Sequence, residues 1–222
     1  MLDDREFSAL TEYRSALYRL LSCLYLMEVD REQLAALIEL SFPQTAGESD
    51  ADRELRQGYA LLEEALRETE ETDLDELAAE YARLFLAAGE ASGRAAFPYA
   101  SVYLDEKHCV GGSAEQKMKA LLLARGRRPD PGAFRTMHDH VGLMLEYMAI
   151  LCDEQLAAGE GQKLNALLRE QRDFLRDDLR SWVHAFTADV VKYAGMKFYS
   201  GVALVTNGFL KKETEFLEAA DE

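Results

Sequence analysis

Apolar residues recur at helical spacing along most of the 222-residue chain, and this pattern constrains the fold more than any other feature. Phe7, Leu10, Leu17, Leu21 and Leu24, for example, follow one another at intervals of three, four or seven residues, with charged residues between them. No segment alternates apolar and polar residues over the length of a strand. The sequence therefore predicts an all-α fold, with about nine to twelve helices in a single domain over residues 1–222.

Capping residues suggest where some of these helices begin. Ser113, with Gln116 three residues later, has the spacing of a capping box, so a helix is expected to start there. Thr72 or Asp73 can cap an earlier helix. The apolar periodicity predicts further helices over about residues 134–158, 163–179 and 198–217.

The helical pattern fails in the middle of the chain. Residues 87–112 contain Gly89, Gly93, Gly111, Gly112 and Pro98, so we expect a long irregular central loop there. Loops of this length are often functional.

Residues 97–105 of this loop combine three aromatic rings, a proline and an acid. Aromatic rings with polar tips are typical of a groove that is apolar yet orients its ligand. A loop that simply closes over the core would explain Phe97 and Val102. It explains less well the polar members of the segment, which are Tyr99, Ser101, Tyr103 and Asp105.

The charge balance argues against some partners. The chain has 25 Lys and Arg against 41 Asp and Glu, a net charge of −16, which disfavours nucleic acid and stable insertion into an anionic membrane. Residues 1–80 hold 21 acidic and 7 basic side chains, and so carry most of this excess. The acidic region is either a solvated helical face or an attraction for a basic partner.

Targeting and disulfide signals are missing from the printed sequence. The first residues lack a basic start followed by an apolar run, and no uncharged apolar stretch reaches about 18 residues. Three scattered cysteines do not make a disulfide framework. A cytoplasmic location is expected.

The best candidate for chemistry is the segment His138-Asp139-His140, with Glu146 downstream. If the helix already includes Asp139, then Asp139 and Glu146 are seven residues apart and share a face, while His140 points toward the core. His140 can be a neutral structural histidine or part of an acid/base pair. Two histidines two residues apart diverge on a helix, so we expect no metal. The chain also lacks a P-loop, a dinucleotide-binding glycine fingerprint and a nucleophile elbow, and we expect no other cofactor and no enzyme activity.

Three segments together carry a family resemblance. They are Tyr81-Ala82-Arg83-Leu84-Phe85, then Pro98-Tyr99-Ala100-Ser101-Val102-Tyr103-Leu104, and then Asp139-His140-Val141-Gly142-Leu143 followed by Glu146-Tyr147-Met148. In order and spacing, this set resembles the TorD/DmsD/NarJ-type family of redox-enzyme maturation chaperones over roughly residues 10–215.

The resemblance implies an all-helical cytoplasmic chaperone, as a monomer or homodimer. It would bind the precursor of a molybdopterin-dependent oxidoreductase through its twin-arginine signal peptide and assist cofactor insertion before export. The implied peptide-binding residues are Tyr81, Leu84, Phe85, Pro98, Tyr99, Ser101, Tyr103, Asp105, Asp139, His140 and Glu146. The alternative is a helical metal-binding or acid/base protein that uses His138, Asp139 and His140.

Overall fold

The computed structural model describes residues 3–68, 74–88, 94–106, 108–127, 136–159 and 161–220. Within these ranges the regular elements are ten α-helices and one π-helical segment, η2, which confirms the predicted all-α class. An isolated bridge joins Tyr99 to His140. The chain divides into two compact units: residues 1–26, 99–182 and 214–222 form the first, and residues 27–98 and 183–213 form the second. The single domain over residues 1–222 stays a prediction.

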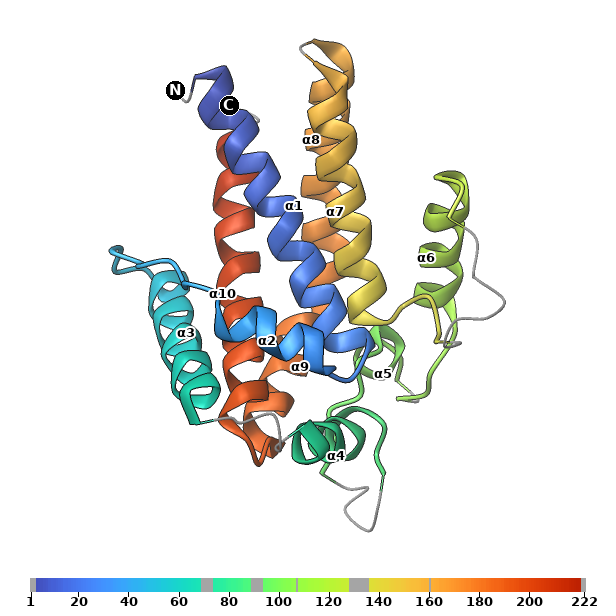
Figure 1. Ribbon diagram of the computed structural model, residues 1–222. Helices are drawn as coiled ribbons and strands as arrows, with labels where there is room; N and C mark the ends of the chain where they lie inside the picture. The colour runs from blue at the N-terminus through green and yellow to red at the C-terminus, as the bar shows by residue number, and fades with distance from the viewer. Residues whose placement is uncertain are drawn as a thin grey trace. The chain divides into compact units, whose positions relative to one another are not determined.

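The first unit is built around long helices that lie side by side (Figure 1). Its elements are α1 (Asp4–Leu26), α5 (Ala100–Leu104), α6 (Ser113–Ala124), α7 (Val141–Ala158), α8 (Gln162–Phe174) and η2 (Leu175–Leu179), with the first residues of α9 (Arg180–Tyr193) and the last of α10 (Lys197–Ala219).

Helices α1 and α7 approach closely at a glycine. A Cβ atom on Gly142 would lie 2.9 Å from the carbonyl oxygen of Ser22 and 2.5 Å from Cγ of Leu26, so a larger residue would force the helices apart. The hydroxyl of Ser22 donates a hydrogen bond to the carbonyl oxygen of Gly142 at 2.7 Å. This contact fixes the start of α7 against the end of α1.

A buried polar network joins the same helices further along. The Arg14 side chain on α1 donates to Gln155 of α7 at 3.3 Å and to Gln171 of α8 at 2.6 Å. Gln155 in turn donates to the hydroxyl of Thr11 at 2.8 Å. Such a satisfied network favours one packing arrangement of the three helices, because any other would leave buried donors unpaired.

The second unit contains α2 (Arg31–Ile38), α3 (Asp50–Glu68), α4 (Leu74–Phe85) and the remaining parts of α9 and α10. Glycines let α3 and α10 pack backbone to backbone. A Cβ on Gly58 would lie 2.8 Å from the backbone nitrogen of Val205, and a Cβ on Gly201 would lie 2.9 Å from the carbonyl oxygen of Gly58.

Aromatic rings fill the core of this second unit. The ring of Phe85 lies 5.2 Å from Tyr81, 5.5 Å from Tyr199 and 6.2 Å from Phe186. On α4, the Glu80 carboxylate pairs with Arg83 at 2.7 Å and accepts a hydrogen bond from the backbone nitrogen of Gly195.

Several predicted boundaries need correction. The expected capping box at Ser113 is wrong: Gly112 is the N-cap of α6 and makes no side-chain cap. The helix expected from about residue 134 begins at Val141, since residues 136–140 are not helical. The helix expected to end near 179 continues through η2 and α9 to Tyr193, because the π-helical segment keeps the chain helical there. The central loop is interrupted by α5, which periodicity did not predict.

Two other predictions about helices have different outcomes. The last helix, expected over about 198–217, is confirmed by α10. The proposed caps Thr72 and Asp73 lie outside the described residues.

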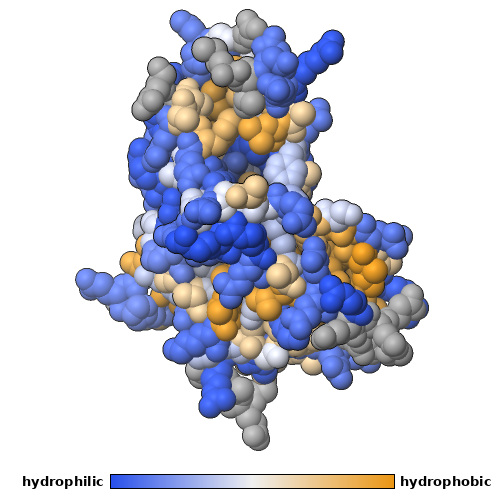
Figure 2. Space-filling model, turned by 90° about the vertical axis from the view of Figure 1, so that its left-hand side faces the viewer, coloured by the Kyte–Doolittle hydropathy of each residue, from blue (hydrophilic) through white to orange (hydrophobic). Residues whose placement is uncertain are grey.

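Hydrophobic side chains reach the surface in patches among mostly hydrophilic ones, as Figure 2 shows for one face. Among the described helices, none is both long enough and apolar enough to cross a membrane. In the first unit, the exposed large apolar residues include Leu104, Val110, Leu123 and Met137.

Candidate functional site

The eleven expected peptide-binding residues are distributed over both units. Tyr81, Leu84, Phe85 and Pro98 belong to the second unit. The other seven belong to the first unit, and they are Tyr99, Ser101, Tyr103, Asp105, Asp139, His140 and Glu146.

The second-unit residues are buried. Tyr81, Leu84 and Phe85 expose 4%, 0% and 2% of their surface, and the two rings belong to the aromatic core of that unit. Pro98 is buried as well. Tyr81, Leu84 and Phe85 therefore pack the core of the second unit in this structure, and their contact with a peptide stays a prediction.

Asp139 is a buried carboxylate that holds the start of α5. Its side chain is inaccessible to solvent, and its Oδ2 accepts a hydrogen bond from the backbone nitrogen of Ser101 at 2.9 Å. Its carbonyl oxygen accepts from the nitrogen of Ala100 at 3.0 Å. Its Oδ1 is buried and has no hydrogen-bond partner within the described part of the chain. The expectation that Asp139 shares a helical face with Glu146 is wrong, because α7 begins two residues after Asp139.

His140 is the N-cap of α7. Its Nδ1 accepts a hydrogen bond from the backbone nitrogen of Gly142 at 3.1 Å, and its ring meets that of Tyr99 edge to face at 5.2 Å. Burial lowers the pKa of His140 from 6.5 to about 3, since a charged imidazole would lose its hydration there. At neutral pH this side chain is an uncharged cap whose Nδ1 is already engaged, as expected for a structural histidine pointing toward the core.

The three residues of the His138-Asp139-His140 segment have separate partners. His138 lies apart from the other two, with its Nδ1 2.8 Å from a carboxylate oxygen of Glu115 on α6. In the part of the chain that the structure describes, no group of three or more His, Cys, Asp or Glu side chains could hold a metal ion. The geometry therefore gives no support to the metal-binding alternative.

Helix α5 is anchored on one side and exposed on the other. The Ser101 hydroxyl accepts a hydrogen bond from the nitrogen of Gly111 at 3.0 Å, and the Tyr103 ring stacks on Trp182 at 5.5 Å. On the outer side, Leu104 is 50% exposed, and the neighbouring Asp105 and Glu106 are exposed as well. The expected residues Tyr99, Ser101, Tyr103, Asp139 and His140 thus hold α5 in place.

A pocket of about 470 Å³ opens beside the outer side of α5, and we call it the α5–α6 pocket. Its lining comes from α5 and the following turn, from the start of α6 and from η2. The lining residues are Ser101, Leu104, Asp105, Glu106, Gly111, Ser113, Ala114, Lys117 and Asp178. Three carboxylates and one ammonium group surround an exposed leucine, so the pocket suits a ligand with a cation beside an apolar group.

Glu146 does not line this pocket. It lies on α7, where burial raises the pKa of its carboxyl group and the nearby Arg19 guanidinium, 4.0 Å away, opposes that shift. The acidic residues of the α5–α6 pocket are instead Asp105, Glu106 and Asp178.

Sequence analysis missed Leu104, Glu106, Lys117 and Asp178 as site residues. A leucine followed directly by two acids, Leu104-Asp105-Glu106, is a signal that could have drawn attention to the end of α5. Nothing in the local sequence links Asp178 to Lys117, because they are 61 residues apart and meet only through packing.

The chain is similar to known proteins over most of its length. The family model described as nitrate reductase delta subunit matches residues 48–188. A protein from Shewanella pealeana named chaperone protein TorD is 28% identical over 221 residues, covering 96% of this chain and 94% of the relative. A Vibrio cholerae protein of the same name is 28% identical over 218 residues, with 96% of each covered. A solved structure described as a putative redox enzyme maturation protein from Archaeoglobus fulgidus is 21% identical, covers 92% of this chain and 93% of its own, and has a TM-score of 0.48.

Proposed function

Because this chain belongs to the nitrate reductase delta subunit family, we propose that it is a chaperone for the maturation of a redox enzyme. The family match confirms the resemblance carried by the three sequence segments. The curated relatives are named chaperones, in agreement with the expectation of a binding protein rather than an enzyme.

The more specific part of the proposal concerns the client. The protein binds the twin-arginine signal peptide of a molybdopterin-dependent oxidoreductase precursor in the cytoplasm, before the cofactor is inserted and the precursor is exported. The observation that carries this part is the α5–α6 pocket, where exposed Leu104 lies among the carboxylates of Asp105, Glu106 and Asp178.

The pocket's chemistry matches the two halves of such a peptide. The basic start of a signal meets carboxylates, and its apolar stretch covers Leu104 in the pocket and Val110 next to the lining residue Gly111, each 50% exposed. Burying one side chain of this size contributes roughly 1.5–3 kcal/mol, and micromolar affinity needs about 8 kcal/mol net. A few such contacts are therefore enough, even after the cost of ordering the peptide.

Residues behind α5 contribute indirectly to this proposal. Asp139 and Ser101 set the position of α5 through the 2.9 Å hydrogen bond, and so keep Leu104 and Asp105 on the pocket side. We assign Asp139, Ser101 and His140 a positioning role and assign direct contact with the peptide to Leu104, Asp105 and Glu106.

The test compares two leucines. Leu104→Ala removes an apolar side chain from the pocket, and Leu123→Ala removes one of similar exposure, 44%, from α6 outside the pocket. Calorimetric titration with the client's signal peptide should show a loss of about 1–2 kcal/mol for Leu104→Ala and little change for Leu123→Ala.

Salt provides the second readout. Affinity for the peptide should fall as salt rises, because rim carboxylates are screened, and Asp105→Asn should flatten that dependence. If Leu104→Ala is folded and binds the signal peptide as tightly as the parent does, this placement of the peptide is refuted.

A further inference from the structure

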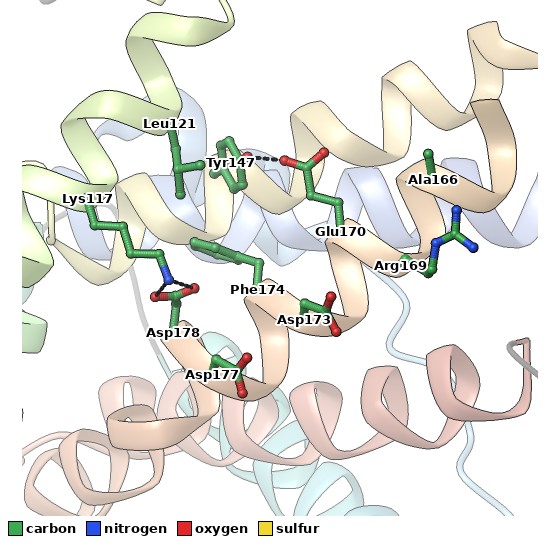
Figure 3. A pocket seen from close by; sticks show the side chains of 10 residues that line it. All are labelled: Lys117, Leu121, Tyr147, Ala166, Arg169, Glu170, Asp173, Phe174, Asp177 and Asp178. Atoms are coloured by element: carbon green, nitrogen blue, oxygen red, sulfur yellow. Dashed lines mark hydrogen bonds and ion pairs between the residues drawn. The ribbon is translucent and has the colours of Figure 1, made fainter. Parts of the chain in front are cut away.

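A second pocket of the first unit, of about 430 Å³, lies among α6, α7, α8 and η2, and we call it the α6–α8 pocket (Figure 3). Leu121, Tyr147 and Phe174 supply its apolar wall, and the two rings lie 4.7 Å apart. Its rim carries four carboxylates and two cations. Lys117 and Asp178 line both this pocket and the α5–α6 pocket.

Two residues that line the α6–α8 pocket, Tyr147 and Glu170, already bind a guanidinium group of the chain that is not itself part of the lining. The Arg125 guanidinium lies over the Tyr147 ring, 4.7 Å from its centre, and donates hydrogen bonds to the Tyr147 hydroxyl at 2.6 Å and to Glu170 at 2.8 Å. An aromatic face beside a carboxylate is favourable for arginine through both stacking and charge. Arg125 shows that this combination binds a guanidinium here, and its side chain is only 15% exposed.

The opposite end of the pocket holds a cation that can leave. The Lys117 ammonium contacts both oxygens of Asp178, at 2.6 and 2.7 Å, as the dashed lines in Figure 3 show. The Lys117 side chain is 55% exposed, whereas that of Asp178 is 19% exposed, so the lysine can move into solvent while the carboxylate stays in the pocket wall. An ion pair open to solvent on one side contributes little to stability. An arginine satisfies both carboxylate oxygens at once with its planar fork, which a lysine ammonium does less well.

We propose that the Lys117–Asp178 ion pair is a removable partition between the two pockets, and that an arginine of the bound peptide displaces Lys117 from Asp178. The arginine then lies where the pockets meet, and an apolar side chain next to it in the peptide enters the α6–α8 pocket against Leu121 and Phe174. The partner is thus a peptide segment with an arginine beside apolar residues. This inference rests on the proposed function, because it assumes that the peptide reaches Asp178 through the α5–α6 pocket.

The inference predicts that removing a positive charge from the protein strengthens binding. Lys117→Met keeps most of the side-chain length and leaves Asp178 without its cation. The probe is a synthetic peptide with an arginine pair followed by a leucine- and alanine-rich stretch, compared with the same peptide carrying glutamine in place of both arginines. Lys117→Met should bind the arginine peptide roughly two- to fivefold more tightly than the parent does. The variant and the parent should bind the glutamine peptide with the same affinity.

A neighbouring lysine supplies the matched control. Lys119 is exposed on the same helix and lines neither pocket, so Lys119→Met reports the general effect of losing one positive charge. Asp178→Asn should weaken the arginine peptide about tenfold and the glutamine peptide much less. In the double variant Lys117→Met/Asp178→Asn, the gain from the lysine substitution should disappear.

The outcomes separate the two proposals. If the parent binds neither peptide, the proposed function fails and this inference fails with it. If the parent binds the arginine peptide but Lys117→Met gains no more than Lys119→Met, the partition is refuted and the proposed function stands. Thermal melts of each variant confirm the fold, and Lys117→Gln serves as a second neutral replacement.

Discussion

His140 lies buried at the N-terminus of α7, where a charged imidazole would lose its hydration, and its replacement by asparagine tests this directly. Asparagine is a good N-cap, and its side-chain oxygen can accept the hydrogen bond that Gly142 now donates to the imidazole. Asparagine also does not titrate. The His140→Asn variant therefore keeps the cap and removes the proton-binding group.

The magnitude follows from the pKa of His140, which burial lowers from 6.5 to about 3 in the folded protein. The unfolded chain then binds one more proton than the folded one between these values, so stability falls as pH falls. The stabilisation is fully present above pH 6.5 and declines by about 1.4 kcal/mol per pH unit below it, until pH approaches 3. Between pH 7 and pH 5, this histidine alone should cost the parent about 2 kcal/mol.

Urea unfolding at pH 7, 6 and 5 measures the effect, since all other titrating groups are shared by parent and variant. At pH 7 we expect His140→Asn to be less stable by about 1–3 kcal/mol, because it loses the ring contact with Tyr99 and leaves space. By pH 5 the difference should shrink by about 2 kcal/mol. His184→Asn, at an exposed site on α9, serves as the control for the loss of one histidine. Parallel pH curves for the parent and His140→Asn would refute the reasoning.

Two further variants probe packing. Asp139→Ala leaves the buried amide of Ser101 without its acceptor, and urea unfolding should show a free energy of unfolding lower by about 1–3 kcal/mol. Asp139→Asn keeps an acceptor and should lower that free energy less, so equal losses for the two variants would contradict the capping role. Gly58→Ala would bring a Cβ to 2.8 Å from the nitrogen of Val205 and should lower the free energy of unfolding by about 1–3 kcal/mol. Gln57→Ala, at the exposed neighbouring position, should change it little. A Gly58→Ala variant as stable as the parent would argue against the close approach of α3 and α10.

Local sequence predicts helices well here and their ends less well. The periodicity of Leu17, Leu21 and Leu24 predicts one apolar face, and α1 buries Leu21 and Leu24 on it while Leu17 is half-buried. The start of α7 could not be read in the same way. Asp139 and His140 fit a helical pattern in the sequence, but residues 138–139 form a turn and His140 itself is extended, in a bridge with Tyr99.

The sequence predicts which segment carries the candidate site, but not which of its side chains face solvent. The aromatic segment 97–105 led to α5, yet which side of this helix faces solvent depends on partners far away in the sequence. Tyr103 faces inward because it stacks on Trp182, and this leaves Leu104 outside. Asp178 could not be predicted as a site residue for the same reason, since it lies on η2 and contacts Lys117 of α6 only through packing of the two helices.

The two residues most prominent in the family-like motif thus have adjacent structural tasks. Asp139 holds the N-terminus of α5 and His140 caps α7, so consecutive residues tie two helix starts together. In the proposed function these buried groups fix the backbone and do not touch the peptide, so they cannot distinguish one client from another. The proposal therefore assigns discrimination between clients to exposed side chains around the pocket, above all Leu104 and Asp105, which can change without disturbing either cap.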